Sequence, residues 1–247
     1  MKKFSEGLEY ELNEDGKSYS VVGINKNCKD TDIFIPFRHK YLPVTSIADR
    51  AFYDCKYITS IIISHTVTSI GDWAFCECES LTNITLPDRL TKIGERAFAL
   101  CNSLTNITLP DRLISIGDYA FSHCTSLKEI NIPGTVTTIN NGIFSMCTSL
   151  TNITLPDRLI SIGEDAFYNC TSLKNIDIPS TVTSIGAWSF AYCESLTSIV
   201  FPKNASIGRY AILGCINIKD IDNKRNDPNC KNLNHLIKFL TVDCYWV

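Results

Sequence analysis

Cysteine offers the widest choice of chemistry in this 247-residue chain, which contains twelve of them. Eight of these recur at a nearly constant spacing, and such residues can form disulfides, bind a metal or pack as small apolar groups. These eight are Cys55, Cys78, Cys101, Cys124, Cys147, Cys170, Cys193 and Cys215. Cys76 and Cys78 resemble half of a zinc site, but no second pair follows at zinc spacing. We therefore expect packed core thiols without a metal or cofactor, and only Cys28, Cys230 and Cys244 remain as candidates for a bridge.

Histidine and paired acidic residues provide little support for catalysis. The four histidines occupy unrelated positions, and none stands beside a serine or cysteine in a recognisable nucleophile motif. They are His39, His65, His123 and His235. The pair Glu164 and Asp165 follows a glycine, where acidic residues commonly begin a turn. We predict that the chain is not an enzyme. A hydrolase stays as an alternative, which would require a close carboxylate pair with a raised pKa in a pocket between repeats.

The charge balance and the apolar runs exclude two classes of partner. The 23 basic and 26 acidic residues are spread along the chain, without the basic stripe that phosphate binding requires. The apolar runs are far shorter than the ~20 residues that span a bilayer. The opening MKKFSEGLEYE has the lysines of a signal peptide but lacks the apolar stretch that should follow. We expect no nucleic acid partner, no transmembrane segment, and either a cytoplasmic location or export to the cell surface after removal of a signal.

A repeat of 23 residues organises most of the chain. Phenylalanine recurs at this spacing, and Ile212 takes its place in the last copy, one residue early. The positions are Phe52, Phe75, Phe98, Phe121, Phe144, Phe167 and Phe190. A fixed period of this length is typical of a solenoid, in which each unit buries its apolar side against its neighbours. Seven or eight copies fit, and a five-residue insertion near residues 38–42 lengthens the first.

Each repeat contains two extended pieces and one turn. In residues 81–87, LTNITLP, the apolar residues end in a period of two, which predicts a strand with Ile84 and Leu86 inward. A second short extended piece, LTKIG at 90–94, ends at a glycine, and we interpret this glycine position as one that requires positive φ. Asn140 replaces the glycine in one copy and fits this interpretation. The following segment, with Ala97 and Phe98, is predicted to form a single helical or 3₁₀ turn.

The two ends of the chain depart from the repeat. Leu8 to Leu12 and Tyr19 to Val22 alternate in polarity and flank an Asp-Gly pair, which predicts a β-hairpin. Residues 217–229, NIKDIDNKRNDPN, can hold one degenerate strand, and residues 233–240 have the spacing of a short amphipathic helix. We therefore expect a capping hairpin in residues 1–32, a solenoid of seven to eight 23-residue coils in 33–215, and a C-terminal cap in 216–247.

The repeat frame LxxIxIPxxVxxIGxxAFxxCxS resembles the BspA-like class of leucine-rich repeats. Residues 173–195, LKNIDIPSTVTSIGAWSFAYCES, illustrate the match. The resemblance implies a right-handed solenoid of parallel strands with short helical or 3₁₀ turns. It also implies an adhesion or protein-binding scaffold, often at the surface of host-associated microbes, with extracellular matrix proteins among its partner classes.

Outward positions that vary between copies are the candidates for ligand binding. The strand row comprises the exposed positions of the first extended piece, and the turn row is the position just before Ala-Phe. We predict a protein ligand on the strand row first, because strands in repeat proteins usually line the regular, inward-curved face that extended partners use. The turn row comes second, since it is rich in aromatic residues that favour interfaces. The candidates are Lys128, Glu129, Asn131, Lys174, Asn175, Asp177, Trp73, Tyr119 and Trp188. A structural spacer is the alternative, which the near-identical copies at 81, 104 and 150 favour. We expect a monomer.

Overall fold

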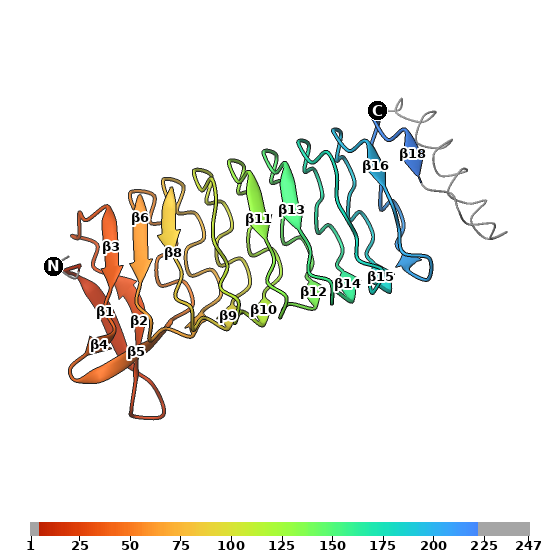
Figure 1. Ribbon diagram of the computed structural model, residues 1–247. Coiled ribbons are helices and arrows are strands. Elements are labelled where there is room, and N and C mark those ends of the chain that lie inside the picture. Colours follow the sequence, from red (N-terminus) through yellow and green to blue (C-terminus); the bar gives the residue numbers. More distant parts are fainter. Residues whose placement is uncertain (1–4, 222–247) are drawn as a thin grey trace.

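The computed structural model describes residues 5–221, which wind into a solenoid of about eight coils (Figure 1). Parallel strands of successive coils lie side by side, and partners in neighbouring repeats are 23 residues apart, as in the pairing of Ser60 with Asn83. Within residues 5–221 no helix is present that could span a membrane. The parallel-strand solenoid predicted from the repeat is therefore confirmed.

Two rows of short strands run along the solenoid. The strand row contains the first extended piece of each repeat, and its strands are β3 (Asp32–Ile35), β6 (Ser60–Ile63), β8 (Asn83–Thr85), β11 (Glu129–Asn131), β13 (Asn152–Thr154), β16 (Ser198–Ile199) and β18 (Asp220–Ile221). The second strand row contains the other piece, in β5 (Leu42–Ile47), β7 (Ser69–Ile70), β9 (Lys92–Ile93), β10 (Ser115–Ile116), β12 (Thr138–Ile139), β14 (Ser161–Ile162), β15 (Ser184–Ile185) and β17 (Ser206–Ile207). Alternate residues point inward because side chains on a strand alternate between faces.

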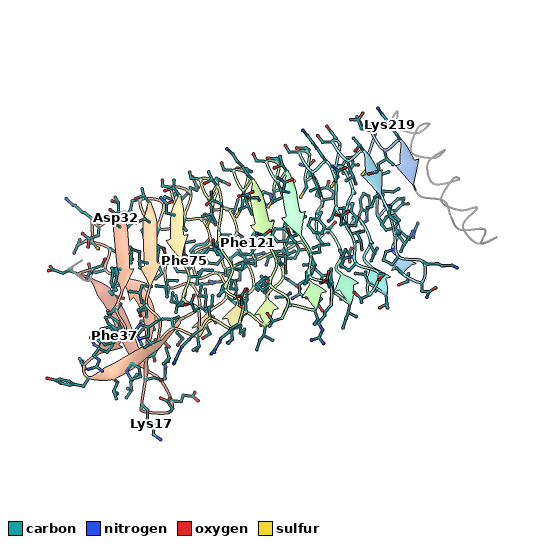
Figure 2. All side chains as sticks on the ribbon, in the orientation of Figure 1. Lys17, Asp32, Phe37, Phe75, Phe121 and Lys219 are labelled. Atoms are coloured by element: carbon teal, nitrogen blue, oxygen red, sulfur yellow. The ribbon has the colours of Figure 1, made fainter. Side chains whose placement is uncertain are left out.

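The core between the rows is built around a column of stacked phenylalanine rings (Figure 2). All seven, from Phe52 to Phe190, are fully buried, and neighbouring ring centroids are 5.2 to 5.8 Å apart with nearly parallel planes. One ring per coil at this spacing excludes water along the whole axis. Apolar burial of this kind is the main stabilising contribution in a repeat protein, because no single coil has a core of its own.

A second column, of cysteine thiols, lies beside the rings. Each thiol from Cys78 to Cys215 donates to the carbonyl oxygen of a phenylalanine in the preceding coil, as Cys101 Sγ does to Phe75 at 3.2 Å. Burial raises the pKa of these thiols, for Cys124 to about 12. The predicted inward position is confirmed, and the thiol adds a hydrogen bond between coils to its role as a small apolar group.

The predicted helical turn is wrong, because residues 5–221 contain no helix and the Ala-Phe segment forms hydrogen-bonded turns instead. Alternate backbone N–H groups of this segment donate to the next coil, as Trp73 does to Glu95 at 2.7 Å and Phe75 to Ala97 at 2.8 Å. Two residues of the turn are left-handed, with φ of 59° at Trp73 and 64° at Glu77. Left-handed residues interrupt a right-handed helix. Only the alternate donors bond within the turn, as Cys76 N–H does to the Trp73 carbonyl at 3.1 Å.

The interpretation of the repeated glycine is also wrong. Gly117 does not have a positive φ; a Cβ there would lie 2.4 Å from the backbone N of Glu95 in the preceding coil. Glycine is therefore required for close approach of two backbones. At Asn140 the side-chain amide, rather than a glycine N–H, donates to the carbonyl of Ile116 at 2.6 Å. The second strand row is interrupted here, since β10 and β12 belong to different sheets.

The N-terminal end covers the first coil. β1 (Leu8–Leu12) and β2 (Tyr19–Ile24) pair antiparallel, and β2 continues as a parallel neighbour of β5. The insertion near residues 38–42 forms a second small hairpin, in which β4 (Arg38–His39) pairs with the start of β5. At the other end β18 pairs with β16, which confirms the degenerate strand. The helix predicted for residues 233–240 lies outside the described residues, as do Cys230, His235 and Cys244.

Candidate functional site

The strand row presents its candidate residues on an exposed face. Lys128 and the two outward residues of β11, Glu129 and Asn131, are exposed, and so are their counterparts two coils further on. These counterparts are Lys174, Asn175 and Asp177. The coil between them contributes β13, so the two groups are separated by about 10 Å at the usual strand spacing. The structure therefore brings the six predicted residues onto one face without direct contact between the groups.

Threonine at the first outward position of this row has a structural partner. The hydroxyl of Thr82 donates to the carbonyl of Thr59 at 3.0 Å, and that of Thr151 donates to the carbonyl of Lys128 at 3.0 Å. The hydroxyl thus reinforces the ladder between coils. Lys128 and Lys174 occupy the same position with a long, exposed cationic side chain, so these two coils present charge to solvent where other coils present a bonded hydroxyl.

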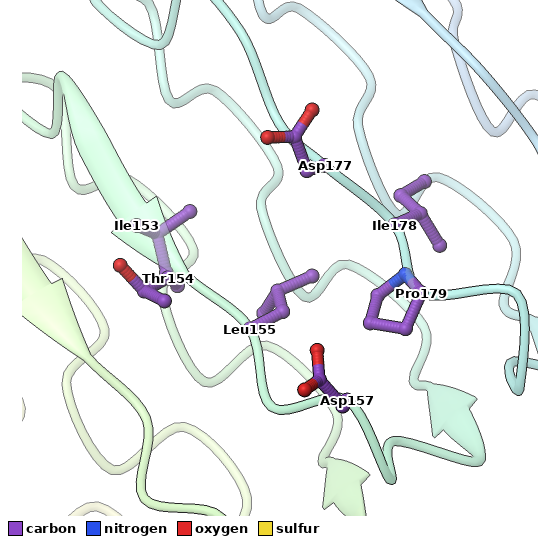
Figure 3. Close-up of a pocket in the computed structure, with 7 residues that line it drawn as sticks. All are labelled: Ile153, Thr154, Leu155, Asp157, Asp177, Ile178 and Pro179. Carbon is purple, nitrogen blue, oxygen red and sulfur yellow. The ribbon is translucent and has the colours of Figure 1, made fainter.

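The strand row opens into a shallow pocket between β13 and the coil that follows it (Figure 3). Residues 173–179 are not assigned to a strand, and β13 pairs only with β11. The pocket has a volume of about 320 Å³ and is lined by Ile153, Thr154, Leu155, Asp157, Asp177, Ile178 and Pro179. Asp177 was a predicted site residue, whereas Thr154 and Asp157 were missed. They were missed because the inward residues of this repeat follow the same pattern as in other repeats, so the sequence does not indicate that strand pairing is interrupted here.

The pocket combines a small apolar floor with two carboxylates. Asp157 and Asp177 are its only charged lining residues, and both are exposed. No cluster of three or more His, Cys, Asp or Glu residues that could hold a metal occurs within residues 5–221. An open surface of this kind is suited to contact with a polypeptide rather than to enclosure of a small molecule.

The turn row is engaged in contacts within the chain. The guanidinium carbon of Arg96 lies 4.7 Å from the ring centroid of Trp73 and 4.7 Å from that of Tyr119. The ring of Tyr119 covers Gly142 of the next coil, where an added Cβ would lie 2.0 Å from a ring carbon. These side chains are half-buried. The three predicted aromatic residues of this row, with Trp188 packed against Tyr210, therefore shield the neighbouring turns.

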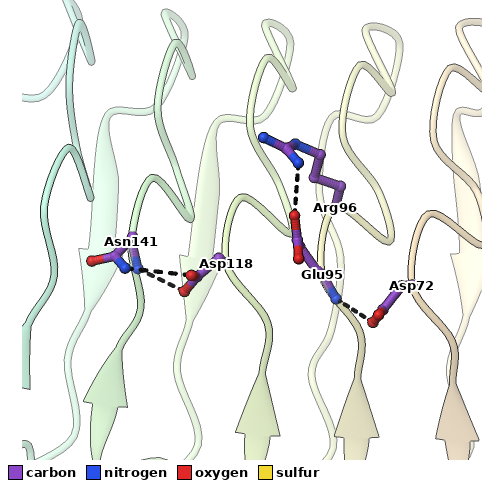
Figure 4. Close-up of polar contacts among 5 residues, drawn as sticks. All are labelled: Asp72, Glu95, Arg96, Asp118 and Asn141. Carbon is purple, nitrogen blue, oxygen red and sulfur yellow. Dashed lines mark hydrogen bonds and ion pairs between the residues drawn. The ribbon is translucent and has the colours of Figure 1, made fainter.

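A series of carboxylates supports the turn row from beside it (Figure 4). Asp72 accepts a hydrogen bond from the backbone N–H of Glu95 at 2.8 Å, and Asp118 accepts one from the N–H of Asn141 at 3.1 Å. Glu95 pairs with Arg96 at 2.6 Å. Asp72 and Asp118 thus each satisfy a backbone donor of the next coil, as a capping residue does. The sequence interpretation noted acidic residues after the glycine, at Glu164 and Asp165, but assigned them to the start of a turn rather than to a contact with the next coil.

The groups with catalytic potential are dispersed. His123 Nδ1 lies 2.8 Å from the hydroxyl of its neighbour Ser122, and His39 is stacked on Tyr10 at a centroid distance of 3.9 Å. Burial lowers the pKa of both histidines. Burial and then the charge of Glu164 raise the pKa of Asp165, but neither carboxylate lines the pocket of Figure 3.

A family model described as a BspA-type leucine-rich repeat region, with six copies, matches residues 45–147 and 115–234. Among solved structures, the Treponema pallidum leucine-rich repeat protein TpLRR is similar with a TM-score of 0.71 and 24% identity, over 98% of this chain and 97% of that chain. A leucine-rich cell surface protein from Faecalibacterium prausnitzii has a TM-score of 0.67 and 28% identity, over 90% and 76%. A leucine-rich repeat protein from Bacteroides ovatus has a TM-score of 0.64 and 24% identity, over 90% and 70%. A comparison with curated proteins found no match.

Proposed function

Because this chain belongs to the BspA-type leucine-rich repeat family, we propose that it is a non-catalytic scaffold that binds a protein ligand, a host or matrix protein, through its strand row. The supporting observation is the exposed face of the strand row, on which charged and amide side chains replace the threonines of other coils. Solenoids commonly use such extended surfaces for recognition. The cell-surface description of the Faecalibacterium prausnitzii protein favours a surface location for this chain as well.

The strand row is the preferred surface because its side chains are available. Lys128, Glu129, Lys174 and Asp177 project from two coils on an exposed face, whereas Trp73 and Tyr119 stack on Arg96. Among the strand-row candidates, Asn175 Oδ1 accepts a hydrogen bond from the Thr197 hydroxyl at 3.3 Å, but the charged side chains of this row project into solvent. A ligand on the turn row would have to compete with the cation–π contacts, each worth about 0.5–2 kcal/mol.

The test uses a panel of immobilised extracellular matrix proteins, the partner class that the family suggests. We expect a variant with Lys128, Glu129, Lys174 and Asp177 replaced by Ala to lose at least tenfold in affinity for the panel member that binds. Its melting temperature should stay within about 2 °C, because the four side chains are exposed.

A matched control removes the same charges from another exposed position. Asp88, Arg89, Asp111 and Arg112 lie at the corner between the two strand rows and are all exposed. Their replacement by Ala also removes two acids and two bases. Because these residues lie outside the proposed binding surface, we expect the affinity for the ligand to stay unchanged. Equal loss in both variants would indicate nonspecific charge attraction. Full affinity in the first variant, with loss on Trp73→Ala and Trp188→Ala, would move the binding surface to the turn row.

A structural spacer is the second candidate, favoured by the near-verbatim copies that begin at residues 81, 104 and 150. In that role only the length and stiffness of the rod matter. A chain in which residues 127–132 are replaced by the sequence of residues 104–109 would then retain full function in its source cell. The same chain should lose ligand binding if the scaffold proposal is correct.

A further inference from the structure

Two cysteines are neighbours at the N-terminal end of the solenoid. β3 and β6 are parallel, and the backbone N–H of Thr59 donates to the carbonyl of Thr31 at 2.7 Å. Cys28 lies three residues before Thr31, and Cys55 lies four residues before Thr59. Adjacent strands are about 4.8 Å apart, which is within the range of Cα separations that a disulfide can join. The course of the chain therefore places these cysteines in successive coils.

The pair differs from the other cysteines of the column in its register. Cys78 and Cys101 occupy equivalent positions in successive repeats, so their side chains point in the same direction. This arrangement disfavours the torsion of about 90° that a disulfide needs. The insertion in the first coil makes Asn27 the equivalent of Cys55, and Cys28 is displaced from it by one residue. Cys28 and Cys55 are therefore not in the equivalent positions that disfavour a bridge between the other cysteines.

The surroundings of these two thiols also differ from those along the column. Cys28 Sγ donates to the carbonyl of Glu6 in the N-terminal cap at 3.2 Å. Burial raises the pKa of Tyr57, and the nearby thiols of Cys55 and Cys28 add to this effect. Burial raises the pKa of Cys55, and Cys28 is among the charges close enough to add to this effect. Both are half-buried free thiols, in contrast to the fully buried cysteines from Cys78 to Cys193.

We propose that Cys28 and Cys55 form a disulfide that fastens the N-terminal cap to the first coil when the protein meets a disulfide oxidant such as oxidised glutathione. The thiolate of Cys28 attacks one sulfur of glutathione disulfide, whose S–S bond breaks to release one glutathione. The thiolate of Cys55 then attacks the sulfur of Cys28 in the mixed disulfide and releases the second glutathione. The two protein thiols lose two protons and two electrons, which reduce the oxidant to two thiols.

The bond would act at the end of the solenoid, where β3 is the edge strand of its sheet. It closes a loop from residue 28 to residue 55 that contains β3, β4 and the start of the second strand row. Cross-linking a loop of this length restricts the unfolded chain. We expect the melting temperature of the oxidised protein to exceed that of the reduced protein by about 5–10 °C.

The experiment treats the full chain with oxidised glutathione, alkylates it under native conditions, digests it with trypsin and identifies linked peptides by mass spectrometry. Cleavage after lysine and arginine places Cys28 in NCK, residues 27–29, and Cys55 in AFYDCK, residues 51–56. We expect these two peptides joined by one disulfide. In Cys28→Ser and Cys55→Ser the linked species should be absent, and neither variant should show the rise in melting temperature.

Other outcomes would overturn the proposal. A mixed glutathione disulfide at Cys28 with Cys55 still alkylatable would show that the two sulfurs do not meet. A link from Cys28 to Cys230 or Cys244 would assign the bridge to a different partner, and these residues lie in separate tryptic peptides, NDPNCK and FLTVDCYWV. A linked NCK–AFYDCK species without any change in melting temperature would refute the fastening role.

Discussion

Replacement of Gly117 by Ala tests the contact that sets the spacing between coils. The new Cβ would lie 2.4 Å from the backbone N of Glu95, 2.5 Å from the carbonyl carbon of Gly94 and 2.7 Å from the Cα of Glu95. All three are backbone atoms, so no side chain can rotate away. Relief requires the two coils to separate by roughly 1 Å, an ordinary contact distance being about 3.5 Å or more.

The cost follows from the contacts that such a separation would break. Overpacking of this kind costs about 1–3 kcal/mol, and loss of the hydrogen bond from Gly117 N to the Ile93 carbonyl, 2.9 Å long, adds about 1 kcal/mol. Alanine also reduces the conformational entropy of the unfolded chain, which stabilises the folded state by about 0.4–1 kcal/mol. We expect a net loss of about 2 kcal/mol in the free energy of unfolding. For a chain of this size that corresponds to a decrease of about 4–8 °C in melting temperature.

Gly134→Ala is the matched control, because a Cβ at Gly134 has no atom within 4 Å and its φ is not positive. This variant should be unchanged or more stable by up to about 1 kcal/mol. The assay is urea-induced unfolding of both variants and the parent, followed by circular dichroism. Equal stability of Gly117→Ala and Gly134→Ala, within the about 0.5 kcal/mol typical of surface substitutions, would refute the close-approach explanation of the glycine column.

Three further predictions concern single side chains. Ser189→Ala should increase the free energy of unfolding by about 1–2 kcal/mol, because Ser189 Oγ is buried without a hydrogen-bond partner; a loss of stability in urea unfolding would show that the hydroxyl has one. Asn140→Ala should decrease it by about 1 kcal/mol through loss of the amide bond to the Ile116 carbonyl, and an unchanged unfolding midpoint would contradict that role. The pKa of Cys124 is raised to about 12 in the folded protein from an unperturbed 9.0, so unfolded thiols ionise first and stability should fall as pH rises through this window. Cys124→Ala should show a shallower fall in a pH series of melting temperatures, and a parallel curve would indicate that the thiol is not protected.

The sequence alone determined the fold, because a strict repeat period imposes its own register. Once one phenylalanine is placed inward, every equivalent residue must lie in the same column, and Phe52 to Phe190 do. The same argument located the inward thiols from Cys78 to Cys193. Asp15 and Gly16 between two alternating segments identified the N-terminal hairpin, since its turn chemistry is local. The six strand-row candidates were found to be exposed for the same reason, while their role in binding stays a prediction.

The tertiary structure decided whatever depends on the distance between coils. The sequence shows a glycine at position 117 but not whether it is required for a positive φ or for close approach of two backbones. Only the position of the Glu95 backbone in the preceding coil distinguishes these two explanations. The turn around Phe98 was predicted as helical from the spacing of its inward residues, but every second backbone donor of such a turn bonds to the next coil, as Phe75 N–H does to Ala97. The pocket beside Asp177 lies where β13 has no strand partner in the coil that follows it. Such contacts join residues one repeat apart, and the free energy that selects them belongs to neighbouring coils together rather than to any segment of the sequence.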